Sequence, residues 1–147
     1  MKLSGTVDLS DTPEAVFARL LNRDLLQRCI PGCKELVQIE ERRFKVVVKA
    51  GVGAIRGTFK GDVELHDVEL PESYRMTFTG KSTVGHAKGG ASTRLEAIAT
   101  GTRVHYEGEA KVSGMIAAVG GRLIEVAARK VAQDFFDKLA AEIASAD

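Results

Sequence analysis

The residues that could carry out chemistry are few and far apart along the chain. Cys29 and Cys33 form a C-x3-C pair, whereas redox pairs and zinc knuckles normally use C-x2-C and structural zinc needs a second ligand pair. No second pair exists, so both cysteines are expected to be reduced, structural thiols. The histidines at positions 66, 86 and 105 fit no metal-ligand spacing, and no Ser-His-Asp, Cys-His or paired-carboxylate set can be assembled. The sequence therefore predicts no catalytic residues, no metal site and no enzyme activity.

Two glycine-rich segments resemble nucleotide-binding motifs but depart from them. The segment 51–57 (GVGAIRG) has three residues before its last glycine instead of two, and it lies between strand patterns. The segment 85–92 (GHAKGGAS) lacks a lysine after its last glycine and leads into a strand pattern. Neither segment is expected to bind a nucleotide.

Composition limits the class of protein. The 147 residues are 44% hydrophobic, which is typical of one globular domain, here residues 1–147. Lys and Arg number 21 against 20 Asp and Glu, so no basic excess points to a nucleic-acid partner. The longest nearly uncharged stretch, 112–121, is too short to span a bilayer, and residues 1–5 show no signal region. A cytoplasmic location is expected.

The hydrophobic periodicity predicts an α+β fold. Residues 3–9 alternate as a strand, and two short helices follow, the first capped by Asp11 or Thr12 and the second by Asp24. From residue 34 to 113 the period is two, which predicts six more strands joined by short turns. The last residues switch to a helical period, with an apolar stripe formed by Ile116, Val119, Leu123, Ala127, Val131, Phe135, Leu139 and Ile143. The segment 84–90 is expected to be a loop, and His66 and His105 are expected on outward strand faces.

This order predicts a curved, seven-stranded antiparallel sheet wrapped on one long C-terminal helix, with two short helices after the first strand. The helix would have roughly 28 residues and a length of about 40 Å, and it alone is long enough to cover the apolar face of the sheet.

Small residues on the inward face raise the question of a cavity. The chain has 15 Gly, no Trp and few aromatic residues, and small residues occur on both the strands and the helix. They favour an apolar cavity between sheet and helix, although close helix–sheet packing or β-bulges would use the same glycines. The residues expected to line the cavity are Phe17, Phe44, Val46, Val48, Phe59, Val63, Met76, Phe78, His86, Leu95, Ala97, Tyr106, Ile116, Val119, Gly120, Leu123 and Ala127, with His86 near the mouth.

Four segments in the same order resemble one known family. These are the segment 24–36 with its Cys-Ile-Pro-Gly-Cys core, the run 48–61, the glycine-rich segment 85–89, and the residues 112–124 with Phe135 and Phe136 further on. Together they are similar to the carbon monoxide dehydrogenase CoxG family over essentially the whole chain. Ala54 stands where this family commonly has proline.

The resemblance implies a START-like (SRPBCC), helix-grip fold and a non-enzymatic accessory protein of a molybdenum hydroxylase of the carbon monoxide dehydrogenase type. It also implies a role at the inner face of the cytoplasmic membrane and a link to respiratory electron transport, with peripheral membrane contact.

Two hypotheses follow. In the first, the cavity carries a lipophilic molecule, a respiratory quinone such as menaquinone or another lipid, with no covalent cofactor. In the second, the protein is a ligand-free adaptor that recruits or assembles the hydroxylase. A third interpretation, a cyclase or hydrolase on the same fold, lacks a catalytic constellation.

Overall fold

The alternating pattern of the sequence forms seven antiparallel strands in one sheet. The computed structural model describes residues 1–146. The strands are β1 (Lys2–Leu9), β2 (Cys33–Glu40), β3 (Arg43–Val52), β4 (Ile55–Glu69), β5 (Ser73–Ser82), β6 (Gly85–Ile98) and β7 (Gly101–Ser113). Their order across the sheet is β1-β7-β6-β5-β4-β3-β2, so β1 and β2 are the two edges. The predicted strand content and the meander of β2 to β7 are confirmed.

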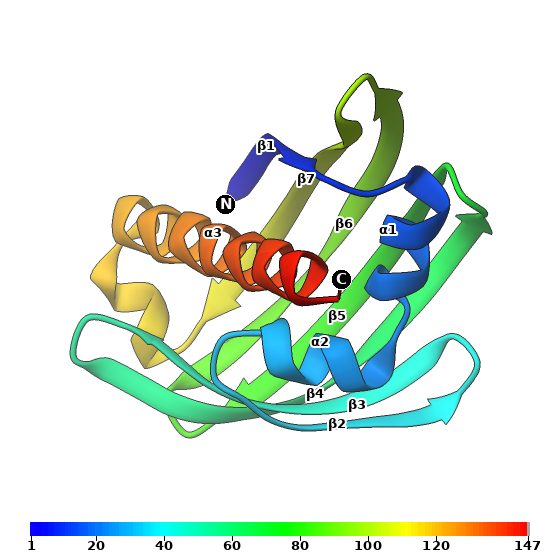
Figure 1. Cartoon of the computed structure of the whole chain (residues 1–147). Helices are drawn as coiled ribbons and strands as arrows, with labels where there is room; N and C mark the ends of the chain where they lie inside the picture. Colours follow the sequence, from blue (N-terminus) through cyan, green and yellow to red (C-terminus); the bar gives the residue numbers. More distant parts are fainter. Residues whose placement is uncertain (147) are drawn as a thin grey trace.

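All helices lie on the concave side of this curved sheet (Figure 1). They are α1 (Pro13–Leu20), α2 (Arg23–Cys29), the 3-10 helix η1 (Met115–Val119) and the long α3 (Gly121–Ser145). Helix α3 crosses the sheet, and α1 and α2 sit beside its C-terminal end (Figure 1). No helix in residues 1–146 is long and apolar enough to cross a membrane.

The two short helices begin at side-chain caps. The Ala15 N–H donates to Thr12 Oγ1 at 3.2 Å, which confirms one of the two caps expected for α1. The cap expected for α2 is wrong: Asn22, not Asp24, accepts from the Leu25 N–H at 3.0 Å. Asp24 instead lies within the first turn, where its carboxylate complements the positive end of the helix.

The C-terminal helix is shorter than expected because the backbone changes conformation at Gly120. This residue has φ +97°, a value that glycine adopts readily and other residues rarely do. Residues 115–119 consequently form a separate 3-10 turn, and α3 has 25 residues.

The prediction of a loop at residues 84–90 is also wrong. Only Thr83 and Val84 form the turn, and Gly85 to Gly90 belong to β6, with His86 opposite Lys81 of β5 and Ser113 of β7. Glycine is uncommon inside strands, so a glycine-rich strand resembles a loop in sequence.

The tightly packed core occupies one end of the molecule. Its buried side chains come from α1, α2, the C-terminal half of α3 and the facing ends of the strands, and they are Leu9, Val16, Phe17, Leu20, Leu25, Cys29, Leu95, Val104, Phe136, Leu139 and Ile143. We call this group the packed end. The residues of α3 that belong to it lie in the second half of the helix.

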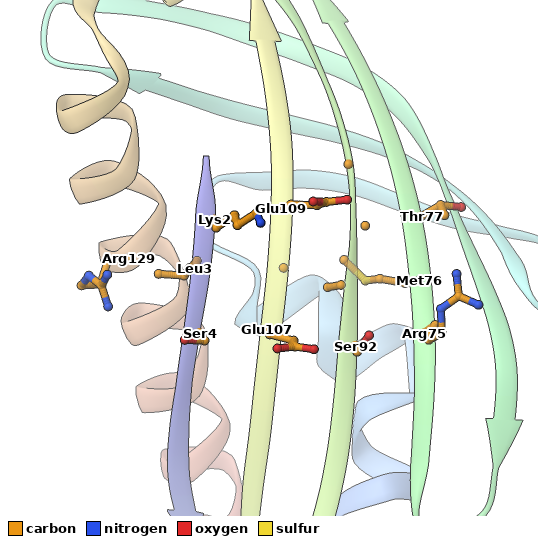
Figure 2. A pocket seen from close by; sticks show the side chains of 14 residues that line it. Lys2, Leu3, Ser4, Arg75, Met76, Thr77, Ser92, Glu107, Glu109 and Arg129 are labelled. Carbon is orange, nitrogen blue, oxygen red and sulfur yellow. The ribbon is translucent and has the colours of Figure 1, made fainter.

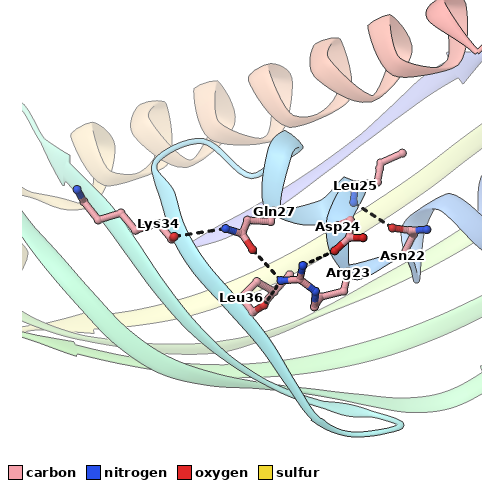
Figure 3. A network of polar contacts seen from close by, with 7 residues as sticks. All are labelled: Asn22, Arg23, Asp24, Leu25, Gln27, Lys34 and Leu36. Carbon is pink, nitrogen blue, oxygen red and sulfur yellow. Dashed lines mark hydrogen bonds and ion pairs between the residues drawn. The ribbon is translucent and has the colours of Figure 1, made fainter.

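A polar network fastens α2 to the edge strand β2 (Figure 3). The Arg23 guanidinium donates to Gln27 Oε1 at 2.8 Å and to the Leu36 carbonyl at 2.5 Å, and it contacts Asp24. Gln27 also donates to the Lys34 carbonyl at 3.3 Å. The network closes the β2 side of the concave face, where Leu36 is 3% exposed.

Candidate functional site

The concave face of the sheet divides into a packed end and an open half. Alternate residues of β3, β4 and β5 point to this face, as their burial pattern and register show. Apolar side chains on these strands that lie away from the packed end are only half-buried, and they are Val46, Val48, Phe59, Val63, Met76 and Phe78. We call this group the open half. Solvent therefore reaches inward-facing apolar side chains beneath the first part of α3.

Small residues separate these apolar side chains. In the cross-strand rows of β5, β6 and β7, Met76 is followed by Ala91 and Gly108. Phe78 is followed by Gly89 and Ala110. These rows place few atoms on the face that α3 overlies.

The glycines of this face do not serve to bring α3 closer. A Cβ built on Gly108 would meet Gly90 and Ala91, one on Gly80 would meet Phe59, and one on Gly61 would meet the backbone of Thr79. None of these nearest atoms belongs to α3. These glycines therefore do not bring α3 into close contact with the sheet, which was the alternative interpretation of their positions.

An open hollow of about 670 Å³ lies at the glycine-rich part of the sheet (Figure 2). Most of its lining side chains, among them Lys2, Arg75, Thr77, Glu107 and Glu109, are at outward positions of β1, β5 and β7, so this hollow lies on the convex face of the sheet. The inward positions Leu3, Met76, Gly89, Ala91 and Gly108 also line it, together with Arg129 of α3. A second hollow of about 530 Å³ adjoins it and is lined mostly by outward positions such as Thr77, Thr79 and Lys88, with Phe78 and Ala110 also among its lining residues.

The structure separates the residues expected to line a cavity into several groups. Phe17, Leu95 and Tyr106 belong to the packed end or pack against it. Phe44 and Ile116 are buried outside it, and Val119 and Ala127 are half-buried beside the open half. His86, Ala97, Gly120 and Leu123 are exposed, and the others make up the open half. Of the whole set, only Met76 lines the larger hollow and only Phe78 lines the smaller one.

His86 and Ala97 are exposed for different reasons. His86 alternates with the inward-facing Gly85 and Ala87, so its side chain lies on the convex face with Lys88. Ala97 is near the C-terminal end of β6, which ends at Ile98. The expected position of His86 at a cavity mouth depended on the loop that the structure replaces with a strand.

The apolar stripe of α3 is turned partly away from the sheet. Leu123 is 54% and Val131 is 47% exposed, and Val126 between them is 60% exposed. Ile124, Ala127, Ala128 and Ala132 are the less exposed positions of the first half of the helix. Met115 of η1, 58% exposed, is a further exposed apolar side chain.

The strands contribute no acid–base or metal chemistry to the concave face. His66 is hydrogen-bonded to Thr77 Oγ1 at 3.0 Å and His105 to Glu96 Oε1 at 2.9 Å, both on the convex face as expected. The hydrogen bond from His105 holds the pKa of Glu96 below its usual range. Residues 1–146 contain no group of three His, Cys, Asp or Glu side chains placed to hold a metal ion.

The two cysteines form no disulfide in the structure. Cys29 is fully buried in the packed end, and burial raises the pKa of its thiol. Cys33, at the start of β2, is half-buried, and its pKa is also raised by burial. Neither thiol has the lowered pKa of a reactive cysteine.

An antiparallel sheet curved around a long C-terminal helix, with an incompletely filled apolar concave face, defines a START-like protein of the helix-grip fold. A START superfamily protein from Mycobacterium smegmatis has this fold, with a TM-score of 0.76 at 10% identity over 99% of both chains. The chain belongs to the carbon monoxide dehydrogenase CoxG family, whose model matches residues 5–144.

Two further solved structures resemble the chain. A conserved protein from Geobacillus kaustophilus is 30% identical, with a TM-score of 0.94 over 99% of this chain and 96% of that one. A protein from Thermus thermophilus is 14% identical, with a TM-score of 0.73 over 100% and 99% of the two chains. The curated proteins contain no match to this chain.

Proposed function

We propose that this protein is a non-catalytic accessory protein of a molybdenum hydroxylase of the carbon monoxide dehydrogenase type. It binds a lipophilic molecule, an isoprenoid quinone, on the open half of the concave face. By carrying this molecule between the enzyme and the inner face of the cytoplasmic membrane, it links the enzyme to the electron-transport chain. The family supports the partner, and the half-buried apolar side chains of the open half support the ligand.

The energetics favour a ligand with an apolar chain. Burying about 300 Å² of a flat ring contributes about 7 kcal/mol at 25 cal/mol per Å². Association costs at least about 4 kcal/mol, so a ring alone would bind only at about millimolar concentration. Each isoprene unit that is also buried adds further apolar area, which lowers the dissociation constant below the millimolar range.

The first experiment is extraction of the folded protein with organic solvent after expression in a quinone-producing host. Mass spectrometry should find an isoprenoid quinone at a constant ratio to protein. Ala91→Leu together with Ala110→Leu, which fills the small-residue rows, should lower that ratio strongly. Ala99→Leu, at an exposed turn position, is the matched control and should leave the ratio unchanged. Protein that carries no lipophilic molecule and shows no mass shift on quinone addition would contradict the proposal.

A second candidate function is that of an adaptor without a ligand, and the exposed side of α3 favours it. Leu123 and Val126 are large apolar side chains more than half exposed, beside the exposed Arg122. Contiguous apolar surface of this kind is common at protein–protein contacts. If the Ala91→Leu, Ala110→Leu variant still captures the hydroxylase and supports its function, whereas Leu123→Ser with Val126→Ser does not, the adaptor is the better description.

A further inference from the structure

Three hydroxyl-bearing side chains form one row across the concave face. Tyr74 of β5 pairs with Thr93 of β6, and Thr93 pairs with Tyr106 of β7. The row ends at β1, where Gly5 is the partner of Tyr106. All three side chains lie at inward positions of their strands, and each is half-buried.

This hydroxyl row (Tyr74, Thr93 and Tyr106) is the boundary between the packed end and the open half. On one side, the next row of the sheet contains Leu95 and Val104, which are 7% and 0% exposed. On the other side, the next row contains the small residues Ala91 and Gly108. A molecule placed over the small residues therefore meets the hydroxyl row before it meets the packed end.

The two tyrosine rings are held in place by the packed end. Tyr74 lies edge-on to Phe17, with ring centroids 5.5 Å apart. Tyr106 stacks on Phe136 with centroids 5.1 Å apart. Burial raises the pKa of Tyr74, so its hydroxyl stays protonated at neutral pH.

The Tyr106 hydroxyl is not fully buried. It lies over Gly5, where a Cβ would come within 2.6 Å of it, so only glycine leaves room for it there. It is not hydrogen-bonded to another of the described residues. Among residues 1–146, every fully buried side-chain oxygen or nitrogen has a hydrogen-bond partner. The Tyr106 hydroxyl has none, so its oxygen is accessible.

We propose that the hydroxyl row binds the oxygen-bearing ring of the ligand, which therefore enters ring first, with its apolar chain directed along the open half toward η1. This inference rests on the proposed function and adds to it the orientation and the chemical class of the ligand. The far end of the concave face supports the direction of the chain, because Ile116 of η1 lies against Gly85 there and donates its N–H to the Val84 carbonyl at 2.8 Å.

The row also defines which oxygen-bearing ligands fit. Hydroxyls donate and accept hydrogen bonds, so they can bind the carbonyl of a quinone and the hydroxyl of the reduced quinol alike. The inward positions of β1 and of β3 to β7 hold no Lys, Arg, Asp or Glu. A charged headgroup would lack a partner at the row, so the ligand class is a neutral oxygenated ring.

The sequence supplies its own probe for the test. The chain has two tyrosines and no tryptophan, so its intrinsic fluorescence comes from Tyr74 and Tyr106 alone. We would titrate the purified protein with a naphthoquinone that carries one prenyl unit and, separately, with the matched prenylnaphthalene that lacks both oxygens. Isothermal calorimetry gives both affinities, and tyrosine quenching by the quinone reports its proximity to the row.

The expected result is a loss of quinone affinity in Tyr106→Phe of about fivefold, the usual worth of one hydrogen bond. Thr93→Val should lower it by a similar factor, whereas neither variant should change the affinity for the prenylnaphthalene. Thr58→Val, on the exposed face of β4, is the matched control and should change neither affinity. Thermal unfolding checks that each variant is folded.

Two other outcomes would overturn the inference, and they can be told apart. If both molecules bind and the hydroxyl variants bind the quinone as the parent protein does, the orientation is wrong and the proposed function stands. If neither molecule binds the parent protein, the proposed function fails and the orientation fails with it.

Discussion

The Tyr106 ring stacks on the Phe136 ring at an interplanar angle of 26°, and this pair marks where α3 begins to pack closely on the sheet. Beyond it toward the C-terminus of the helix, Leu139 and Ile143 are buried. Before it, Ala127 and Ala128 are only half-buried and Val131 is 47% exposed. The helix is thus anchored by its second half.

The first prediction concerns the different contribution of the two halves to stability. Phe136→Ala should lower the free energy of unfolding by about 3–5 kcal/mol, the usual cost of a buried phenylalanine. Phe78→Ala, in the open half, should cost less than about 2 kcal/mol, because a half-buried ring loses less apolar area. Urea unfolding followed by circular dichroism measures both, and equal losses would mean that the open half is as tightly packed as the packed end.

The division of the concave face could be predicted from the sequence only in part. Period two places Thr93 and Tyr106 on inward faces without any structure. Their adjacency to Tyr74 depends on the register between β5 and β6, which is set by the short turn at Thr83 and Val84. Glycines concealed that turn by making a strand resemble a loop, and the hydroxyl row could not be recognised.

The rotation of α3 about its own axis could not be predicted from the sequence pattern, for a different reason. Leu123 and Val131 fit an apolar stripe with Ala127, but Ile124, Ala128 and Ala132 fit another stripe one residue away. Periodicity identifies a helix and its apolar positions, whereas the rotation of the helix depends on what it packs against. Its packed partners, Phe136 and Leu139, lie in the second half and determine that rotation.

The second prediction concerns two glycines that are cross-strand partners, Gly61 of β4 and Gly80 of β5. A Cβ on Gly61 would overlap the Thr79 carbonyl, whereas one on Gly80 would meet Phe59 at an ordinary 3.7 Å. Gly61→Ala should therefore lower the unfolding free energy by more than about 2 kcal/mol. Gly80→Ala should change it by less than about 0.5 kcal/mol. Thermal and urea unfolding of the two variants test the pair, and similar values for both would contradict the close strand approach at Gly61.

The third prediction concerns acid sensitivity at the bridge between α2 and α3. Arg28 donates from Nε and Nη2 to the two carboxylate oxygens of Glu142, at 2.8 and 3.3 Å. This hydrogen bonding holds the pKa of Glu142 below its ordinary value. Near that pKa, the Glu142 carboxylate binds fewer protons in the folded state than in the unfolded state. Its contribution to stability is therefore present above the unfolded-state pKa, and it is lost as the pH falls through the folded-state pKa.

Glu142→Gln should accordingly reduce the difference in stability between pH 6 and pH 3. Glu125→Gln is the matched control, because Glu125 pairs with Arg129 within α3 and joins no second element. Urea unfolding at both pH values gives the comparison. An unchanged pH dependence in Glu142→Gln would show that the bridge does not contribute to folding.

The last prediction concerns the reactivity of the two thiols. Cys29 is fully buried, and its burial raises the pKa of the thiol, so both access and thiolate content are low. Cys33 is half-buried with a raised pKa, and its Sγ lies 3.6 Å from the Glu35 carbonyl. Iodoacetamide at pH 8 should therefore modify Cys33 slowly and Cys29 only after urea unfolding. Peptide mass spectrometry over time resolves the two sites, and rapid native labelling of Cys29 would show that the packed end opens far more readily than its burial implies.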